Sequence, residues 1–310
     1  MQTQLSYYDD FITQGNFGRH ETFTPRYGWL KKGYDAVVRN DRVFLEKNAI
    51  EELGVGKNMV SAIKYWCSAF NLISPDLQNK SKLITTVFGD KLLDDNGWDP
   101  YLEDPASLWL LHWQLFIPPL MSISWNFAFS KCNLWSFDIK QLMMIIMNAT
   151  KMHAKFASLS ENTYLKDASC IIRMYTDEIE DKDDEIDTPF TELNLLNRTV
   201  DSGEVSFNTN FKQNLPPLIF AAACFDYLDN YSSGQQRTIS LQRLTYDFNS
   251  PGIAFKVPET VAGFYLLNAS KKLAGFTLRD DISGYQLYCE EKPKTMYWEA
   301  LETYYKESNN

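Results

Sequence analysis

The sequence predicts a mainly α-helical protein with small β-hairpins, organised as tandem winged-helix or helix-turn-helix-like units. Three observations support this fold class. The stretch from Phe44 to Ile73 reads as a helix, a glycine turn and a second helix. Short β-prone runs come directly after it, and a helix followed by a hairpin recurs between Pro258 and Cys289. A helix followed by a hairpin wing is the order of a winged-helix unit.

The predicted helix-turn-helix has the apolar spacing and the turn residue that this motif needs. Its first helix spans about 47–53, and Gly54 stands where a helix-ending residue with positive φ is favoured. The first turns of the second helix carry short polar or cationic side chains on their outer face. Such side chains contact phosphates and base edges when a recognition helix enters a major groove. An ordinary αα-hairpin in a helical core is the alternative. The side chains predicted to face double-stranded DNA from the second helix are Lys57, Asn58, Ser61 and Lys64.

Basic and aromatic side chains alternate in the preceding segment, FGRHETFTPRYGWLKKG, residues 17–33. Thr24 as N-cap and Pro25 in the first turn predict a helix over about 26–38. Lys31 and Lys32 on this helix complete the predicted DNA-binding set. The helix N-terminus, with arginines beside it, predicts a binding site for a phosphate.

Catalysis, if the protein has it, is expected in the polar cluster of Arg19, His20, Glu21 and Arg26. A histidine can act as general acid or base near neutral pH, and a neighbouring carboxylate can orient it or hold a cation. Two arginines can clamp a phosphodiester and stabilise the charge of its transition state. In the alternative interpretation the arginines only neutralise the DNA backbone, while the histidine and glutamate cap a helix.

The carboxylates of Asp99, Glu103 and Asp104 are the candidate ligands for Mg²⁺ or Mn²⁺. Helix capping combined with a salt bridge to the basic cluster is the alternative role for these three residues. The sequence has no Walker loop, no GxSxG elbow, no HExxH helix and no paired CxxC. These absences argue against P-loop, serine-hydrolase, zincin and zinc-ribbon chemistry.

The order of the remaining elements follows from caps, prolines and apolar spacing. A strand over 82–88 is predicted as part of the hairpin wing, with a loop and one edge strand as the alternative. The last 21 residues, from Glu290, read as mostly helical and surface-like. Helices are predicted after Asp104, after Asp138 or Ser136, and over 216–228 and 258–268, and a hairpin is predicted over 276–289.

Length and composition predict three parts. These are an N-terminal helix-turn-helix domain (1–130), a helical middle region ending in an acidic linker (131–187) and a C-terminal helical domain with a hairpin (188–310). The linker is the run DEIEDKDDEID at 177–187, a solvated stretch that cannot pack. A minority interpretation makes this run a decoy for nucleic acid or a docking strip.

The charge is unevenly distributed along the chain. Residues 16–92 carry 12 Lys and Arg against 8 Asp and Glu, whereas the remainder carries 18 against 32. This balance suits nucleic acid at one end and protein partners elsewhere. No apolar run approaches the ~20 residues of a membrane span, and no secretory leader is visible. The five scattered cysteines read as reduced core residues, so a cytoplasmic protein is expected.

Three stretches together resemble a known bacterial family. They are the 17–33 segment, LGVGKNMVSAIKYWCSAFNLI at 53–73 and GWDPYLEDPASLWLLHW at 97–113. The chain thereby resembles the SspB-like family of DNA phosphorothioation systems, first catalogued as domain-of-unknown-function family 4007. The resemblance implies a DNA nicking endonuclease in anti-phage defence that acts beside a cysteine desulfurase, an ATPase and a sulfur-transfer enzyme. A non-catalytic DNA-reading adaptor and a protein-interaction scaffold are the alternatives, and the sequence leaves a homodimer open.

Overall fold

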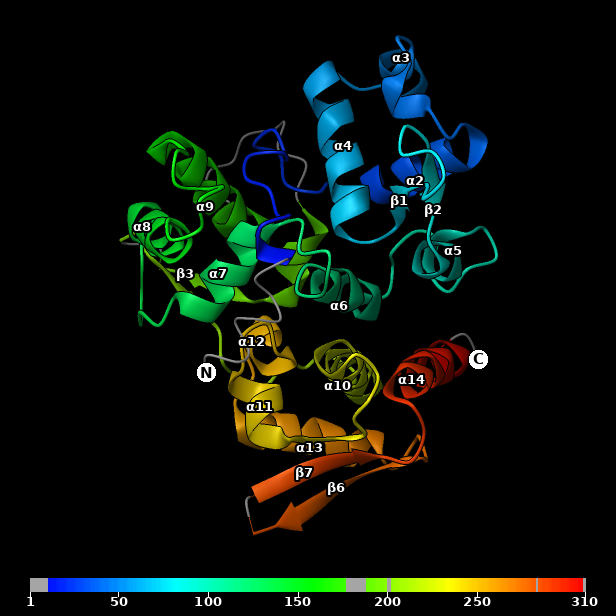
Figure 1. The fold of residues 1–310 in the computed structure, drawn as a ribbon, viewed down its shortest axis with the longest axis vertical. Coiled ribbons are helices and arrows are strands. Elements are labelled where there is room, and N and C mark those ends of the chain that lie inside the picture. The colour runs from blue at the N-terminus through cyan, green and yellow to red at the C-terminus, as the bar shows by residue number, and fades with distance from the viewer. Residues whose placement is uncertain (1–10, 177–187, 200–201, 283, 309–310) are drawn as a thin grey trace.

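A computed structural model describes residues 11–176, 188–199, 202–282 and 284–308. This part of the chain is mainly helical and carries small antiparallel sheets of two or three strands (Figure 1). The coarse fold class predicted from sequence is therefore confirmed. The predicted acidic linker, 177–187, lies outside the described residues.

The N-terminal elements form the upper part of the molecule in Figure 1. The predicted glycine turn is confirmed, because Gly54 ends one helix with φ 61° and the next helix begins three residues later. A two-stranded hairpin then follows, as predicted. The elements in order are α2 (Trp29–Arg39), the 3₁₀ turn η1 (Val43–Leu45), α3 (Ala49–Leu53), α4 (Lys57–Ala69), β1 (Ile73–Pro75), β2 (Leu83–Thr85) and α5 (Val87–Leu93).

The middle elements pack below and beside α4. Asp104 caps the first of these helices, and Asp138 forms a capping box with Gln141 at the third, which confirms both predicted starts. The elements are α6 (Pro105–Gln114), α7 (Ile123–Lys131), α8 (Ile139–Thr150), α9 (Glu161–Tyr175), η2 (Pro189–Leu193) and the antiparallel pair β3 (Leu196–Arg198) and β4 (Val205–Phe207).

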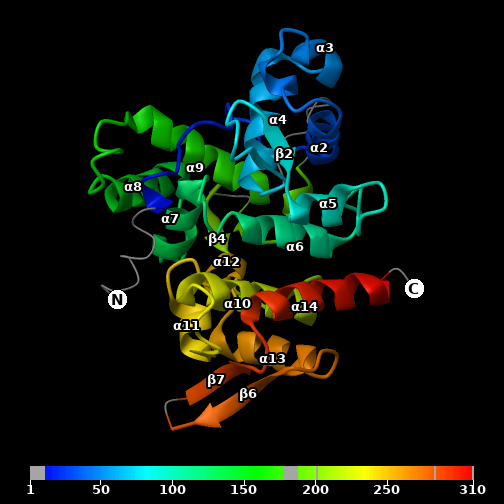
Figure 2. The same cartoon turned by 45° about the vertical axis from the view of Figure 1, so that its right-hand side comes forward.

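The C-terminal elements form the lower part of the molecule in Figures 1 and 2. Their three-stranded sheet has the order β5-β7-β6, with both pairs antiparallel. The predicted 276–289 hairpin is the β6–β7 pair. The elements are α10 (Pro217–Ser232), β5 (Thr238–Ser240), α11 (Leu241–Tyr246), α12 (Pro251–Phe255), α13 (Glu259–Ala269), β6 (Phe276–Asp281), β7 (Gly284–Cys289) and α14 (Pro293–Ser308).

Three details of the sequence prediction were wrong. Helix α2 begins at Trp29 rather than Arg26, because Gly28 takes the left-handed conformation and becomes the cap. The strand predicted over 82–88 is only three residues long, since Thr86 caps α5 by accepting from the amide of Gly89. The C-terminal tail is not surface-like: α14 packs closely on α10. Its buried side chains follow helical spacing and include Met296, Tyr297, Ala300, Leu301 and Tyr305.

One hydrophobic cluster runs through the upper, middle and lower elements of the described chain. His112 of α6 illustrates the continuity, because its two ring nitrogens contact the Tyr175 hydroxyl of α9 and the Ala254 carbonyl of α12, each at 2.8 Å. Burial lowers the pKa of His112 to about 3, so this histidine is a neutral core residue. The division into three domains at 130 and 187 stays a prediction.

Candidate nucleic-acid interface

Helix α4 presents one polar face to solvent. Lys57, Asn58 and Ser61 are exposed, and Lys64 is half-buried one turn further on. Within the described part of the chain, neither lysine forms an ion pair. All four residues predicted to contact DNA from this helix therefore lie on one side of it, with their charge not neutralised by the protein.

The opposite side of α4 is fixed by close packing on α2. Gly33 allows this approach: a Cβ at that position would lie 2.5 Å from the Cys67 sulfur and 2.7 Å from a methyl group of Ile63. Trp66 is completely buried in the same helix and stacks on Phe70, with the ring centres 5.4 Å apart. A helix held this tightly has one rotational setting, which keeps the lysine face outward.

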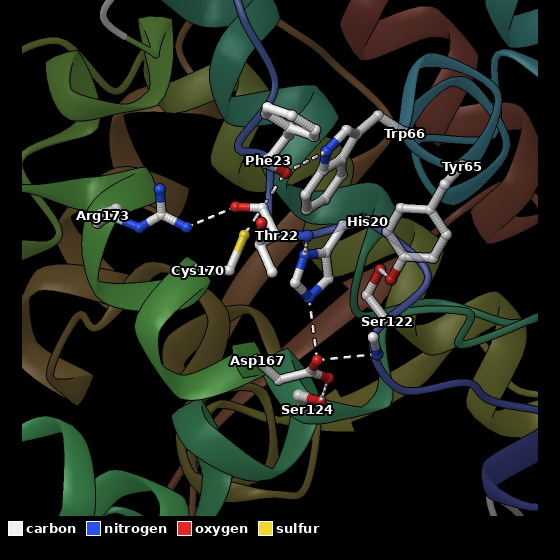
Figure 3. A network of polar contacts seen from close by, with 11 residues as sticks. His20, Thr22, Phe23, Tyr65, Trp66, Ser122, Ser124, Asp167, Cys170 and Arg173 are labelled. Carbon is white, nitrogen blue, oxygen red and sulfur yellow. Dashed lines mark hydrogen bonds and ion pairs between the residues drawn. The ribbon is translucent and has the colours of Figure 1, made fainter. Parts of the chain in front are cut away.

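The segment before α2 lies between α4 and α9 and is held by a buried polar network (Figure 3). Asp167 of α9 is its centre. One carboxylate oxygen accepts from the Gly18 amide at 2.8 Å and from His20 Nε2 at 2.9 Å, and the other accepts from the Ser124 hydroxyl of α7. The Phe23 carbonyl accepts from the Trp66 indole of α4 at 3.0 Å. The loop thus joins the helix-turn-helix to the middle helices.

His20 is fully buried at this centre rather than open to a substrate. Burial opposes its protonation, whereas Cys170 and Asp167 favour it, and the balance raises the pKa of His20 to about 10. The Thr22 amide, however, donates to Nδ1 at 3.1 Å and needs a lone pair there. Two N–H groups cannot point at each other at that distance, so Nδ1 carries no proton in this conformation. The imidazole is then neutral and donates from Nε2 to Asp167.

The other three residues of the predicted catalytic cluster lie around this loop. Arg19 and Glu21 are exposed, and Arg26 is half-buried over the rings of Phe23 and Trp29 at 5.6 and 5.3 Å. Glu21 and the next residue have positive φ angles of 51° and 68°. Non-glycine residues in this conformation carry strain and are often found at functional sites. Arg19 and Glu21 are thus open to solvent and Arg26 partly so, whereas His20 is buried.

The two lysines predicted on α2 differ from those on α4. Lys31 is neutralised within the protein by Asp35 at 2.9 Å and Asp95 at 2.7 Å, which raises its pKa against the effect of burial. Lys32 is exposed and donates to the Leu53 carbonyl at 3.0 Å. Both line a pocket of about 430 Å³ that also contains Tyr101. Of these two lysines, Lys32 is therefore the one whose charge can still contact a DNA phosphate, because no carboxylate of the described chain pairs with it.

The three predicted metal ligands lie at the start of α6. Asp99 is buried and accepts from the amides of Glu103 and Asp104 and from the Ser107 hydroxyl, at 2.6–3.0 Å. Asp104 caps α6 and accepts from the Tyr304 hydroxyl of α14 at 2.9 Å. Glu103 is exposed. Asp99 and Asp104 thus fix the start of α6, and Asp104 attaches the C-terminal helix to it, which is the capping role that the sequence left open.

Replacing Asp104 with alanine is expected to lower the free energy of unfolding by about 1–2 kcal/mol, because α6 loses its N-cap and α14 loses a contact. Glu103→Ala is the matched control and should change it by less than ~0.5 kcal/mol. Urea unfolding measures both. Thermal unfolding with and without Mg²⁺ then distinguishes capping from metal binding. If the carboxylates only cap the helix, Mg²⁺ should change the unfolding temperature equally in wild type and in both variants. A Mg²⁺-induced increase that is present in wild type and lost in both variants would establish a metal site.

Sequence reasoning missed Asp167, although it organises the loop that carries four predicted site residues. A signal for it exists. Asp167 lies on the apolar face of its helix, three residues after Tyr164 and four before Ile171, and all three are buried. A carboxylate in that position must have buried donors. The sequence could not say which donors, because they come from residues more than 40 positions away.

Comparisons with known proteins agree on one relationship. The model of a family described as "Protein of unknown function (DUF4007)" matches residues 17–305. A magnesium ion-bound SspB crystal structure is similar with a TM-score of 0.88 and 32% identity, and a second SspB crystal structure with 0.87 and 33%. Both similarities cover 95% of this chain and 90% of the SspB chain. A comparison with curated proteins found no match. No helix in the described residues is long and apolar enough to cross a membrane.

Proposed function

The chain belongs to the DUF4007 family, and from this membership we propose that it is the DNA-engaging component of a phosphorothioation-based anti-phage defence system. Its similarity to SspB over nearly the whole chain supports this proposal. The proposed partners are double-stranded DNA and the other components of such a system: a cysteine desulfurase, an ATPase and a sulfur-transfer enzyme.

The observation that carries the DNA-binding proposal is the outward face of α4. Lys57 is the first residue of α4 and Lys64 lies about two turns further on, with Asn58 and Ser61 between them. Amide and hydroxyl side chains read base edges, and lysines contact the flanking phosphates. The order α2, α3, α4 and the β1–β2 hairpin fits a winged-helix unit, in which α4 would be the recognition helix.

The C-terminal elements fit a second winged-helix unit with a different surface. The sheet order β5-β7-β6 places the first short strand beside the last one, and α13 precedes the β6–β7 wing. Helix α13 exposes Phe264 and Leu267, each 51% exposed, where a DNA-reading helix would carry cations. We therefore propose that this unit faces protein partners, as the scaffold alternative requires, while the N-terminal unit faces DNA.

Strand nicking is the finer proposal, and it rests on the resemblance to SspB. The residues available for it are the exposed Arg19 and Glu21 and the half-buried Arg26, while buried His20 would position the loop. A role for Mg²⁺ or Mn²⁺ stays a prediction. All four carboxylate oxygens of Asp99 and Asp104 already accept hydrogen bonds, so a cation there would share them with the contacts that cap α6. Among the described residues no three Asp, Glu, His or Cys side chains converge on one point.

Supercoiled plasmid tests the nicking proposal. Wild type is expected to convert it to open circle in Mg²⁺ or Mn²⁺ and not in excess chelator. Arg19→Met and Glu21→Gln should each slow conversion at least tenfold while binding a short duplex within about twofold of wild type, because both side chains are exposed and hold no buried contact. Wild type that leaves the plasmid supercoiled with every metal would eliminate nicking and favour the DNA-reading adaptor.

A further inference from the structure

A second pocket, of about 400 Å³, lies far along the chain from α4. Three segments form it: the loop after α7 with Cys132 to Trp135, the end of β4 with the residues after it, and Lys256 at the end of α12. Two hydrogen bonds between Phe137 and Val205, at 2.8 and 2.9 Å, join the first segment to the second. The pocket is therefore a fixed feature of the fold, and its volume is typical of a small-molecule site.

Lys256 is the charged group of this pocket. It caps α12 with φ 54°, a left-handed conformation that ordinarily favours glycine or asparagine. Its ammonium donates to the Phe129 carbonyl at 2.5 Å and lies 3.8 Å from the centre of the Phe207 ring. In the part of the chain that the structure describes, no carboxylate pairs with it. Burial lowers the pKa of Lys256 to about 7, which reflects this missing counter-charge.

Aromatic and polar side chains complete the lining. Trp135 lines the pocket and is 94% exposed, so its indole face is open to a ligand there. The side chains of Asn133, Ser206 and Thr209 line the pocket too, and within the described ranges none of them has a hydrogen-bond partner. The pocket thus offers an open indole, one ammonium that no carboxylate neutralises within the described residues, and several polar side chains.

We propose that this pocket binds a nucleotide, with the base stacked on Trp135 and the phosphate at the Lys256 ammonium. Lys256 is half-buried and has no carboxylate partner among the described residues, so an anion is the ligand that complements its charge, and a purely apolar peptide would not supply one. Indole rings stack on any base, and the free amide and hydroxyl groups can meet the base edge or the sugar. The nucleotide can be free or can belong to an unpaired DNA strand. The inference goes beyond the duplex contact proposed for α4 and does not depend on it.

Calorimetric titration of the full chain tests this site with four probes: thymidine monophosphate, thymidine, inorganic phosphate and a six-nucleotide thymidine oligomer. The monophosphate is expected to bind at least tenfold more tightly than thymidine or phosphate, because only it can contact the Trp135 ring and the Lys256 ammonium at once. Trp135→Ala should weaken binding about tenfold, and Trp135→Phe, the matched control, should retain it. Lys256→Met should weaken binding by a similar factor. Lys57→Ala with Lys64→Ala should leave it unchanged, which separates this site from α4.

The probes also identify the source of the nucleotide. An oligomer that binds more tightly than the monophosphate supports an unpaired strand, and equal or weaker oligomer binding supports a free nucleotide. Absence of monophosphate and oligomer binding at millimolar concentration would overturn the proposal, and so would equal affinities of Trp135→Ala and Trp135→Phe. Since Trp135 is almost fully exposed, these two variants test the site even if Lys256→Met does not fold.

Discussion

Replacing Asp167 with alanine is expected to lower the free energy of unfolding by about 3–5 kcal/mol. The carboxylate is 1% exposed and accepts from the amide of Gly18, the imidazole of His20 and the hydroxyl of Ser124. Its removal leaves two buried donors and the half-buried Gly18 amide without an acceptor, and each buried donor costs about 1–3 kcal/mol. The shift of the urea midpoint measures this loss.

Glu302→Gln is the control for Asp167→Ala. It breaks an ion pair with Lys91 at 2.8 Å, but that pair lies on the surface, so the free energy of unfolding should change by less than ~1 kcal/mol. Equal effects of the two substitutions would contradict the central role given to Asp167.

The same network bears on His20, because His20→Ala would also disturb the loop. Activity lost in that variant would therefore not identify a catalytic base, whereas Arg19 and Glu21 can be changed without disturbing the buried contacts.

Replacing Lys57 and Lys64 together with alanine is expected to weaken duplex binding roughly 10–100-fold near 0.1 M salt. Each lysine that contacts a phosphate releases about one counterion, so loss of two contacts should reduce the salt slope by about 1.8. The fold should be unaffected, because Lys57 is exposed, Lys64 is half-buried and neither forms an ion pair within the described ranges. Fluorescence anisotropy with a labelled duplex measures the change.

The matched control changes two lysines of another helix. Lys140 and Lys151 are exposed and lie at the start and just past the end of α8. Helix α9 lies between α8 and α4 in both ribbon views (Figures 1 and 2). Lys140→Ala with Lys151→Ala alters the net charge by the same amount. It should leave duplex affinity within about threefold of wild type. A loss equal to that of the α4 variant would mean that total charge, rather than the α4 face, governs binding.

Local signals in the sequence located much of the fold. Three helix termini were marked by local residues and are present in the structure. Gly54 marked the end of one helix, and Asp104 and Asp138 each marked the start of another. Gly28 was overlooked as a cap, since Thr24 and Pro25 form a signal that is equally good locally. The burial of α14 depends on α10, more than 60 residues earlier, and no local pattern specifies that contact.

The candidate site was harder to predict because its residues have roles that depend on distant partners. The α4 residues were placed correctly on an outward face, since helical spacing alone determines which side a residue occupies. In the sequence His20 was a candidate catalytic residue and Asp99 a candidate metal ligand. In the structure His20 hydrogen-bonds to Asp167, and Asp99 accepts hydrogen bonds at the start of α6. Their polar partners could be found only once the chain was folded.

The salt dependence of duplex binding by wild type tests the central claim most directly. If the face of α4 and the neighbouring arginines contact four or more phosphates, log K should fall with log salt concentration with a slope of about −3.6 or steeper, and the slope should flatten in the Lys57 and Lys64 variant. A wild-type slope near zero, or the same slope in both proteins, would contradict the account.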